Sequence, residues 1–154
     1  MMQFVPIDVD KHRNIIVHNR RDSFIVSFGD AHNFNEKDYV NWVKVKAKEF
    51  PQGFVLVEEG GDYIGQLELS IREFDGKRIG YVHLYYVMPE MRGKGKGAKL
   101  HDYATRFFME NDVEEFHLRV SPTNTPAIQF YKKLGMEEIG KEVEGKVIRM
   151  KGYL

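Results

Sequence analysis

Three glycines at alternating positions, placed soon after a strand-like run, restrict the fold more than any other feature of this sequence. Residues 78–87 are rich in aromatic and β-branched residues, which predicts a strand, and Gly93, Gly95 and Gly97 follow. Helical spacing of apolar residues then predicts a helix over about 93–111. Glycines leave successive backbone N–H groups unobstructed, and a helix N-terminus is electropositive, so this segment is suited to binding phosphates. A plain flexible turn is the alternative interpretation.

The remaining patterns predict an α/β (mixed α+β) sheet with helices on its faces, forming one domain over residues 1–154. The Asp75-Gly76 pair predicts a tight hairpin, so residues 54–87 should form an antiparallel meander. Thr125, followed by proline, is expected to cap a helix that ends at Gly135. Residues 8–34 show no pattern clear enough to assign. The other expected elements are an edge strand at 3–7, a helix at 35–50, and strands at 54–57, 63–71, 115–120, 136–141 and 146–153.

Composition excludes several classes of protein. There is no cysteine, which excludes a disulfide framework, a thiolate zinc site and a cysteine nucleophile, and the six histidines lack paired spacing, so we expect no metal. Lys plus Arg number 23 and Asp plus Glu number 23, so no net charge attracts nucleic acid or an anionic membrane. No stretch approaches the roughly 18 apolar residues that span a bilayer, and the N-terminus does not resemble a signal peptide. We therefore expect a cytoplasmic protein.

Two familiar phosphate-binding motifs fit the glycine turn poorly. The nucleoside-triphosphate loop requires Ser or Thr after Gly-Lys, and none follows here. The dinucleotide fingerprint is matched literally by Gly93, Gly95 and Ala98, with Asp112 or Glu114 about 20 residues farther on. That fingerprint belongs after the first strand of a βαβ series, whereas here it follows an antiparallel meander. The context therefore disfavours dinucleotide binding.

A third motif, Q/R-x-x-G-x-G/A, is satisfied by Arg92, Gly95 and Gly97 after a strand that ends in Val-x-Pro-Glu. Farther along, Asn124 and residues 126–136 follow the pattern N-x-x-A-x-x-x-Y-x-x-x-G-F, with methionine in place of the final phenylalanine. With both motifs in this order, residues 81–140 resemble the GCN5-related N-acetyltransferase (GNAT) family.

The resemblance implies a fold and an activity. The fold is a central mixed, mostly antiparallel sheet of six to seven strands, flanked by about four helices. The activity is transfer of an acetyl group from acetyl-CoA to a primary amine, by direct attack in a ternary complex. A non-catalytic module that binds or senses acyl-CoA is the alternative. Dimerisation is common in the family, so a homodimer is compatible with the resemblance.

The resemblance also implies roles for individual residues. Tyr131 matches the general acid that protonates the departing thiolate, although its spacing alone fits a core position. Asn124 matches a cofactor contact, and a turn or helix cap is its alternative role. A backbone N–H of the strand would polarise the thioester carbonyl. The residues implied to contact acetyl-CoA are Tyr85, Tyr86 and Val87 on the strand, Arg92, Gly93, Lys94, Gly95, Lys96, Gly97 and Ala98 in the turn, and Asn124 and Tyr131 in the second motif.

The general base is left open by the sequence. Family members that acetylate protein N-termini often carry a glutamate five residues before the asparagine, where this chain has Arg119. Other members place a base on the strand before the turn, where His83 stands. Glu68 and water are its rivals, because an ammonium acceptor with a pKa of roughly 10.4 must first lose a proton.

The acceptor site is expected partly within residues 18–40. Ser23–Phe28, with Asp30, His32 and Glu36 nearby, suggests an apolar slot with acidic groups for an amine. A core segment followed by a polar loop is the other interpretation. The sequence does not distinguish a polyamine, an aminoglycoside, an amino acid, a small metabolite amine and a lysine side chain.

Overall fold

The computed structural model, which describes residues 1–154, contains one sheet of seven strands in the order β1-β2-β3-β4-β5-β7-β6. All neighbouring strands are antiparallel except β4 and β5, which are parallel. The expected mixed, mostly antiparallel sheet is therefore confirmed. The strands are β1 (Gln3–Pro6), β2 (Phe54–Glu59), β3 (Asp62–Phe74), β4 (Lys77–Val87), β5 (Glu115–Val120), β6 (Glu137–Glu142) and β7 (Val147–Tyr153).

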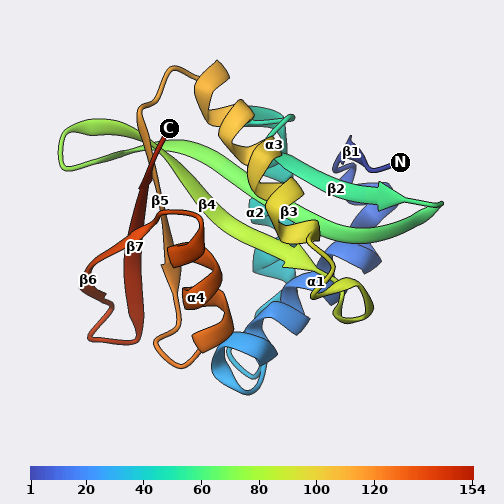
Figure 1. Ribbon diagram of the computed structural model, residues 1–154. Coiled ribbons are helices and arrows are strands. Elements are labelled where there is room, and N and C mark those ends of the chain that lie inside the picture. The colour runs from blue at the N-terminus through green and yellow to red at the C-terminus, as the bar shows by residue number, and fades with distance from the viewer.

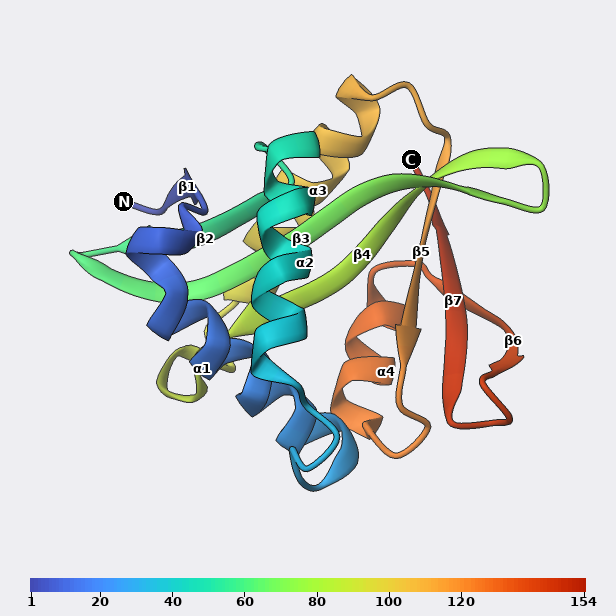
Figure 2. The same cartoon turned by 180° about the vertical axis from the view of Figure 1, so that it is seen from behind.

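Four helices cover the two faces of the sheet. They are α1 (Val9–Phe28), α2 (Glu36–Glu49), α3 (Lys96–Glu110) and α4 (Thr125–Lys133), with a short 3-10 turn, η1 (Pro89–Met91), after β4. The helices α3 and α4 lie on the face toward the viewer in Figure 1. The helices α1 and α2 lie on the opposite face, seen in Figure 2. None of these helices is both long enough and apolar enough to cross a membrane.

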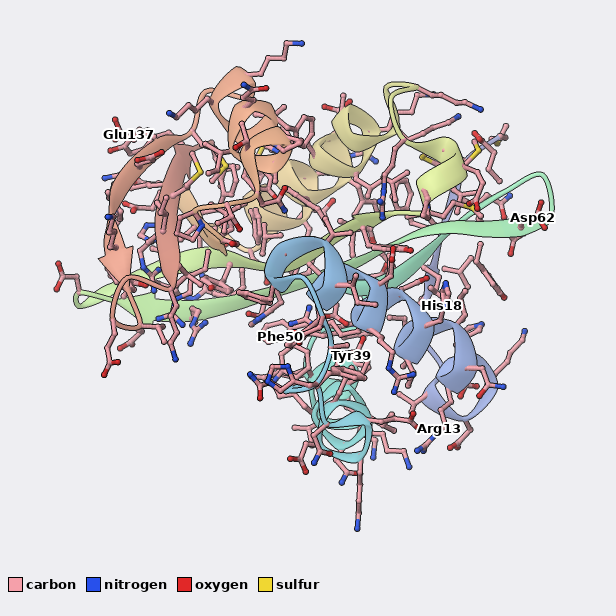
Figure 3. The ribbon with its side chains drawn as sticks, turned by 90° about the horizontal axis from the view of Figure 1, so that it is seen from below. Arg13, His18, Tyr39, Phe50, Asp62 and Glu137 are labelled. Atoms are coloured by element: carbon pink, nitrogen blue, oxygen red, sulfur yellow. The ribbon has the colours of Figure 1, made fainter.

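The core consists of two layers, one on each face of the sheet. Alternation along β2 sends Val55 and Val57 into the layer under α3, and sends Phe54 and Leu56 into the layer under α1 and α2. Figure 3, viewed from below, shows Tyr39 between α2 and the sheet. The figure also shows Asp62 and Glu137 at opposite ends of the sheet.

The helix α1 fills most of the segment that the sequence left unassigned. Its inward face includes two polar side chains, His12 and Asn19, which are 4% and 3% exposed. These interrupt the apolar stripe by which an amphipathic helix is recognised. Each has a partner on β3: the His12 ring bonds the Tyr63 hydroxyl, and the Asn19 amide donates to the buried Gln66. The other predicted elements begin and end within three residues of their expected bounds.

One helix start differs from the prediction. Asn124, rather than Thr125, caps α4, because the Asn124 side chain accepts a hydrogen bond from the backbone N–H of Ala127. Thr125 is already the first helical residue. The expected cap was therefore wrong by one position.

Glycine at position 80 lets α3 pack tightly against β4. A Cβ at Gly80 would lie 2.4 Å from the Phe108 ring, which is itself fully buried and stacked on Phe116. A methyl group at this point would overpack the core.

We expect Gly80→Ala to lower the free energy of unfolding by about 1 to 3 kcal/mol, measured by urea denaturation. Combining it with Phe108→Leu should give a loss smaller than the sum of the two single losses, by about 1 kcal/mol, because the smaller side chain relieves the clash. Strictly additive losses would contradict the contact.

Candidate active site

The strand β4 is irregular at His83 and has a free edge beyond it. The pairing of β4 with β3 shifts register between Val82 and Leu84, so His83 has no partner. On its other side β4 pairs with β5 only from Gly80 to Val82. The two strands then diverge, as Figure 1 shows. From His83 to Val87, one edge of β4 therefore has no strand partner.

An ion pair between Arg20, whose side chain is 21% exposed, and the fully buried Glu68 fixes this bulge. One terminal nitrogen of Arg20 donates to Glu68 Oε1 at 2.9 Å and to the backbone carbonyl of His83 at 3.1 Å. Glu68 is completely buried and also accepts hydrogen bonds from the Tyr39 hydroxyl and the Gln66 amide. Burial, with the carboxylate beside it, raises the pKa of Tyr39, so this phenol remains a donor. The network joins α1, α2, β3 and the bulge of β4.

The glycine turn leads into α3, whose first-turn N–H groups are not capped by any side chain. Gly93 and Gly95 have φ of 77° and 76°, a conformation that favours glycine. Gly95 is the N-cap residue of α3, and the first turn carries no acidic side chain. The N–H groups of residues 93–97 find no acceptor within the protein. In each of the other helices a side chain accepts from the first turn, namely Asp8 in α1, Asn35 in α2 and Asn124 in α4.

Arg92 ties the turn to β4 and to α1. Its Nε donates to the carbonyl of Val87 at 2.7 Å, and its terminal nitrogen lies 3.0 Å from Asp22. The same Asp22 oxygen accepts from the hydroxyl of Tyr86 at 2.7 Å, and Tyr86 is only 3% exposed. The Tyr86 side chain is thus buried and held by the protein itself, whereas the Arg92 guanidinium is anchored on one side and stays 41% exposed.

The other residues of the turn divide between packing and exposure. A Cβ at Gly97 would lie 3.0 Å from the Phe130 ring, so this glycine allows α4 to approach α3. Lys96 pairs with Glu59 at 2.7 Å. This ion pair lowers the pKa of Glu59. The predicted residues of the turn whose side chains stay exposed are Arg92, Lys94 and Ala98.

Tyr131 is half-buried beside the strand that precedes the turn. Its ring centroid lies 6.3 Å from that of Tyr85, and its hydroxyl makes no hydrogen bond within the protein. Burial raises the pKa of Tyr131 to about 12. The Tyr85 hydroxyl, by contrast, pairs with His101 Nδ1 at 3.2 Å. Of these two phenols, Tyr131 is the one free to donate to a ligand.

His83 is enclosed by aromatic rings. Its Nε2 lies 2.7 Å from the Ser70 hydroxyl, and its ring centroid lies 4.9 Å from that of Trp42 and 4.8 Å from that of Tyr81. Burial, with the positive charge of Arg20 nearby, lowers the pKa of His83 to about 3. The imidazole is therefore neutral and weakly basic near pH 7.

Two adjoining clefts meet at this histidine. One, of about 310 Å³, lies where β4 and β5 diverge, and Ser23, Phe24, Ser27 and Phe28 of α1 line one wall. The other, of about 290 Å³, lies between α1 and α2. Both clefts are lined by Arg20, Phe24 and His83. Part of the expected apolar slot therefore exists.

The expected acidic groups lie elsewhere. Asp30, His32 and Glu36 line neither cleft. Asp30 pairs with His32 in the exposed connection between α1 and α2, and Glu36 pairs with Arg13 and Arg21 at 3.3 and 3.5 Å. The expectation that these groups line the slot is wrong.

Two further predicted residues have structural partners. Asn124 caps α4, which was its alternative role in the sequence. Glu68 has no exposed surface and accepts three side-chain hydrogen bonds, so an acceptor in the clefts has no direct path to it.

Sequence reasoning missed Arg20 and Asp22. Both lie on α1, in the unassigned segment, and their partners are 48 and 70 residues away. No local pattern marks such residues.

Comparisons with known proteins agree on one family. The model described as "Acetyltransferase (GNAT) family" matches residues 14–136. An uncharacterized N-acetyltransferase of Archaeoglobus fulgidus is 32% identical over 98 residues, which cover 62% of this chain and 65% of the relative. Another, of Methanocaldococcus jannaschii, is 30% identical over 125 residues, which cover 79% of this chain and 54% of the relative. The chain thus spans less than two thirds of either relative.

A solved structure has the same fold. The PaiA N-acetyltransferase of Thermoplasma acidophilum, in complex with coenzyme A, superposes with a TM-score of 0.76. The superposition covers 100% of this chain and 99% of that chain at 17% identity.

The enclosed His83 should make the protein less stable in mild acid. The unfolded chain binds a proton at this histidine near pH 6.5, whereas the folded chain does so only near pH 3, so the free energy of unfolding falls as pH is lowered through that window. Between pH 7 and pH 5 the wild type should lose about 1 to 2 kcal/mol more than His83→Asn, measured by urea denaturation. Equal losses, or an imidazole NMR titration centred near pH 6.5, would contradict the enclosed site.

Proposed function

Because the chain belongs to the GNAT family of acetyltransferases, we propose that it transfers an acetyl group from acetyl-CoA to a primary amine while both substrates are bound. The observation that carries this proposal is the uncapped N-terminus of α3 at the end of a strand with a free edge. Acetyl-CoA would supply an activated acyl thioester, and the chain's own residues would position it.

The turn suits a diphosphate. The N–H groups of residues 93–97 have no acceptor in the protein, and a Cβ at Gly93 or Gly95 would meet nothing within 4 Å, so there is room for a ligand. Backbone donors at a helix N-terminus are favourable partners for anions. The coenzyme A in the Thermoplasma PaiA structure supports the same ligand class for this fold.

The free edge of β4 suits the rest of the cofactor. Backbone groups of Tyr85, Tyr86 and Val87 would pair with the amides of the pantetheine arm as a neighbouring strand does. A backbone N–H near the bulge would donate to the carbonyl oxygen of the thioester, where negative charge develops as the amine attacks. Tyr131, with its unpartnered hydroxyl, would protonate the sulfur when the carbon–sulfur bond breaks.

The amine must lose a proton before or during the attack. His83 stands where the two clefts meet, but its lowered pKa makes it a weak base. We therefore assign His83 to orienting the amine or a water molecule, and assign removal of the proton to water.

A non-catalytic acyl-CoA-binding module is the second candidate function. It is favoured by the weak basicity of His83 together with the burial of Glu68. Binding of acetyl-CoA without transfer to any amine of a broad panel would support the module and contradict the enzyme.

The glycine turn provides a matched test of cofactor binding. Gly95 and Gly76 both have φ of +76° and open space where a Cβ would lie, but Gly76 is at the tip of the β3–β4 hairpin. Alanine should cost each site similar backbone strain, about 1 kcal/mol. We expect Gly95→Ala to weaken acetyl-CoA binding by about tenfold, because its methyl group occupies the ligand's space. Calorimetric titration should find Gly76→Ala like the wild type. Equal affinities in both variants would remove the turn from the site.

Tyr131→Phe separates the proton donor from the binding site. Loss of the hydroxyl should reduce kcat by about 100-fold, as for a general acid, and change the dissociation constant of acetyl-CoA by less than about threefold. Burial keeps the pKa of Tyr131 at about 12, so the phenol remains protonated over the usual assay range. Unchanged kcat would exclude the acid role.

A further inference from the structure

The cleft of about 310 Å³, which lies where β4 and β5 diverge, is lined by basic residues and by no acidic ones. Arg20 and Arg119 are its charged residues, and no aspartate or glutamate lines it. The charge of Arg20 is balanced by the buried Glu68. Arg119, whose side chain is 43% exposed, is the charge that a molecule in this cleft would meet. The adjoining cleft has one carboxylate, that of Asp38.

Arg119 shares its only carboxylate with a second arginine. Its Nε donates to Glu142 Oε1 at 2.9 Å, while Arg149 Nε donates to the other oxygen of Glu142 at 2.8 Å. Glu142 therefore balances one of two guanidinium charges, and the pair of arginines lowers the pKa of Glu142. The terminal N–H groups of Arg119 make no hydrogen bond or ion pair within the protein.

The guanidinium of Arg72 adds to the positive charge of Arg119 and Arg149 at this end of the cleft. Arg72 lies 4.5 Å from the ring centroid of Tyr81, which lines the cleft, and it has no ion-pair partner. The charges of Arg119, Arg149 and Arg72 all lower the pKa of Tyr81, against the larger effect of burial. This end of the cleft is thus electropositive.

We propose that Arg119 binds an anionic group of the acceptor, so that the acceptor is a primary amine that also carries a carboxylate or phosphate. The inference rests on the proposed function and narrows its substrate. Guanidinium N–H groups pair well with both kinds of anion, through hydrogen bonds strengthened by charge. A polyamine or aminoglycoside would instead bring further cations toward Arg119.

A set of acceptor amines of similar length and different charge tests whether Arg119 binds an anionic group. Butylamine has a neutral tail, putrescine a cationic one, γ-aminobutyrate a carboxylate and aminopropylphosphonate a phosphate-like group. With wild-type protein, kcat/KM for one of the two anionic amines should exceed that for butylamine by about tenfold or more, and that for putrescine by more. Which of the two is preferred distinguishes carboxylate from phosphate. The series is repeated with shorter and longer chains.

Arg119→Gln should lower the ratio of kcat/KM for the preferred anionic amine to that for butylamine by about tenfold, and Arg119→Lys should lower it less. Arg13→Gln is the matched control. Arg13 is 47% exposed and pairs with one glutamate, and Figure 3 shows it on α1, far from the β6–β7 end of the sheet. This control should leave the ratio unchanged.

Three results would overturn the inference. The first is a wild-type preference for butylamine or putrescine. The second is a preference for anionic amines that survives Arg119→Gln in protein that still binds acetyl-CoA. Either result leaves the proposed acetyl transfer intact. The third is a lack of transfer to any amine by protein that binds acetyl-CoA, which overturns the proposed function as well.

Discussion

The buried carboxylate of Glu68 is the point on which the arrangement of this site depends. An ionised carboxylate with no exposed surface costs several kcal/mol unless its lone pairs are satisfied, and removing one partner leaves an uncompensated charge. Glu68 meets this demand with donors from three elements, α1, α2 and β3. Arg20 then uses the same nitrogen to hold the carbonyl of His83. The hydrogen bonds to Glu68 thereby fix α1 and α2 on their face of the sheet. The bond from Arg20 to His83 stabilises the bulge of β4, beside which the clefts lie.

On the other face, contacts between side chains and glycines place the turn and α4. Gly97 admits the Phe130 ring, and the next residue, Tyr131, lies beside Tyr85 on β4. Arg92 joins this half to the first, since it bonds β4 with one nitrogen and Asp22 of α1 with another. The free N–H groups of α3, the free edge of β4 and the clefts are therefore held in one geometry by a few contacts. Such preorganisation lets the donors meet a ligand without rearranging.

Local sequence signals predicted the local features of this protein. The strands, the Asp75-Gly76 hairpin and the glycine turn follow from residues close in the chain, and the structure has all of them. The helix α1 was missed because His12 and Asn19 take inward positions and are satisfied by partners on β3. Motif matching identified the turn, but not that the side chains of Arg92 and Asn124 have structural partners. What the sequence could not supply was the pairing of residues across distant elements, which depends on the finished sheet.

The partners of the titratable side chains near the clefts affect how an amine could lose its proton here. Near the clefts, Glu68 is buried in its network, Asp22 is held by Arg92 and Tyr86, and His83 is weakly basic. Asp38 lines the cleft between α1 and α2 but not the cleft that Arg119 lines. Under the proposed function, no strong base lies in the cleft that Arg119 lines to accept a proton from the ammonium ion. A nearby positive charge, however, disfavours the protonated form of an amine and lowers its pKa. Arg20 is balanced by Glu68, so the charges that remain are those of Arg72, Arg119 and Arg149, offset in part by Glu142 and by the anionic group of the acceptor itself. The net positive charge left over would shift the bound amine toward the neutral, nucleophilic form, and water could carry the proton away. The electropositive wall that attracts an anionic group would in this way also perform part of the work of the missing base.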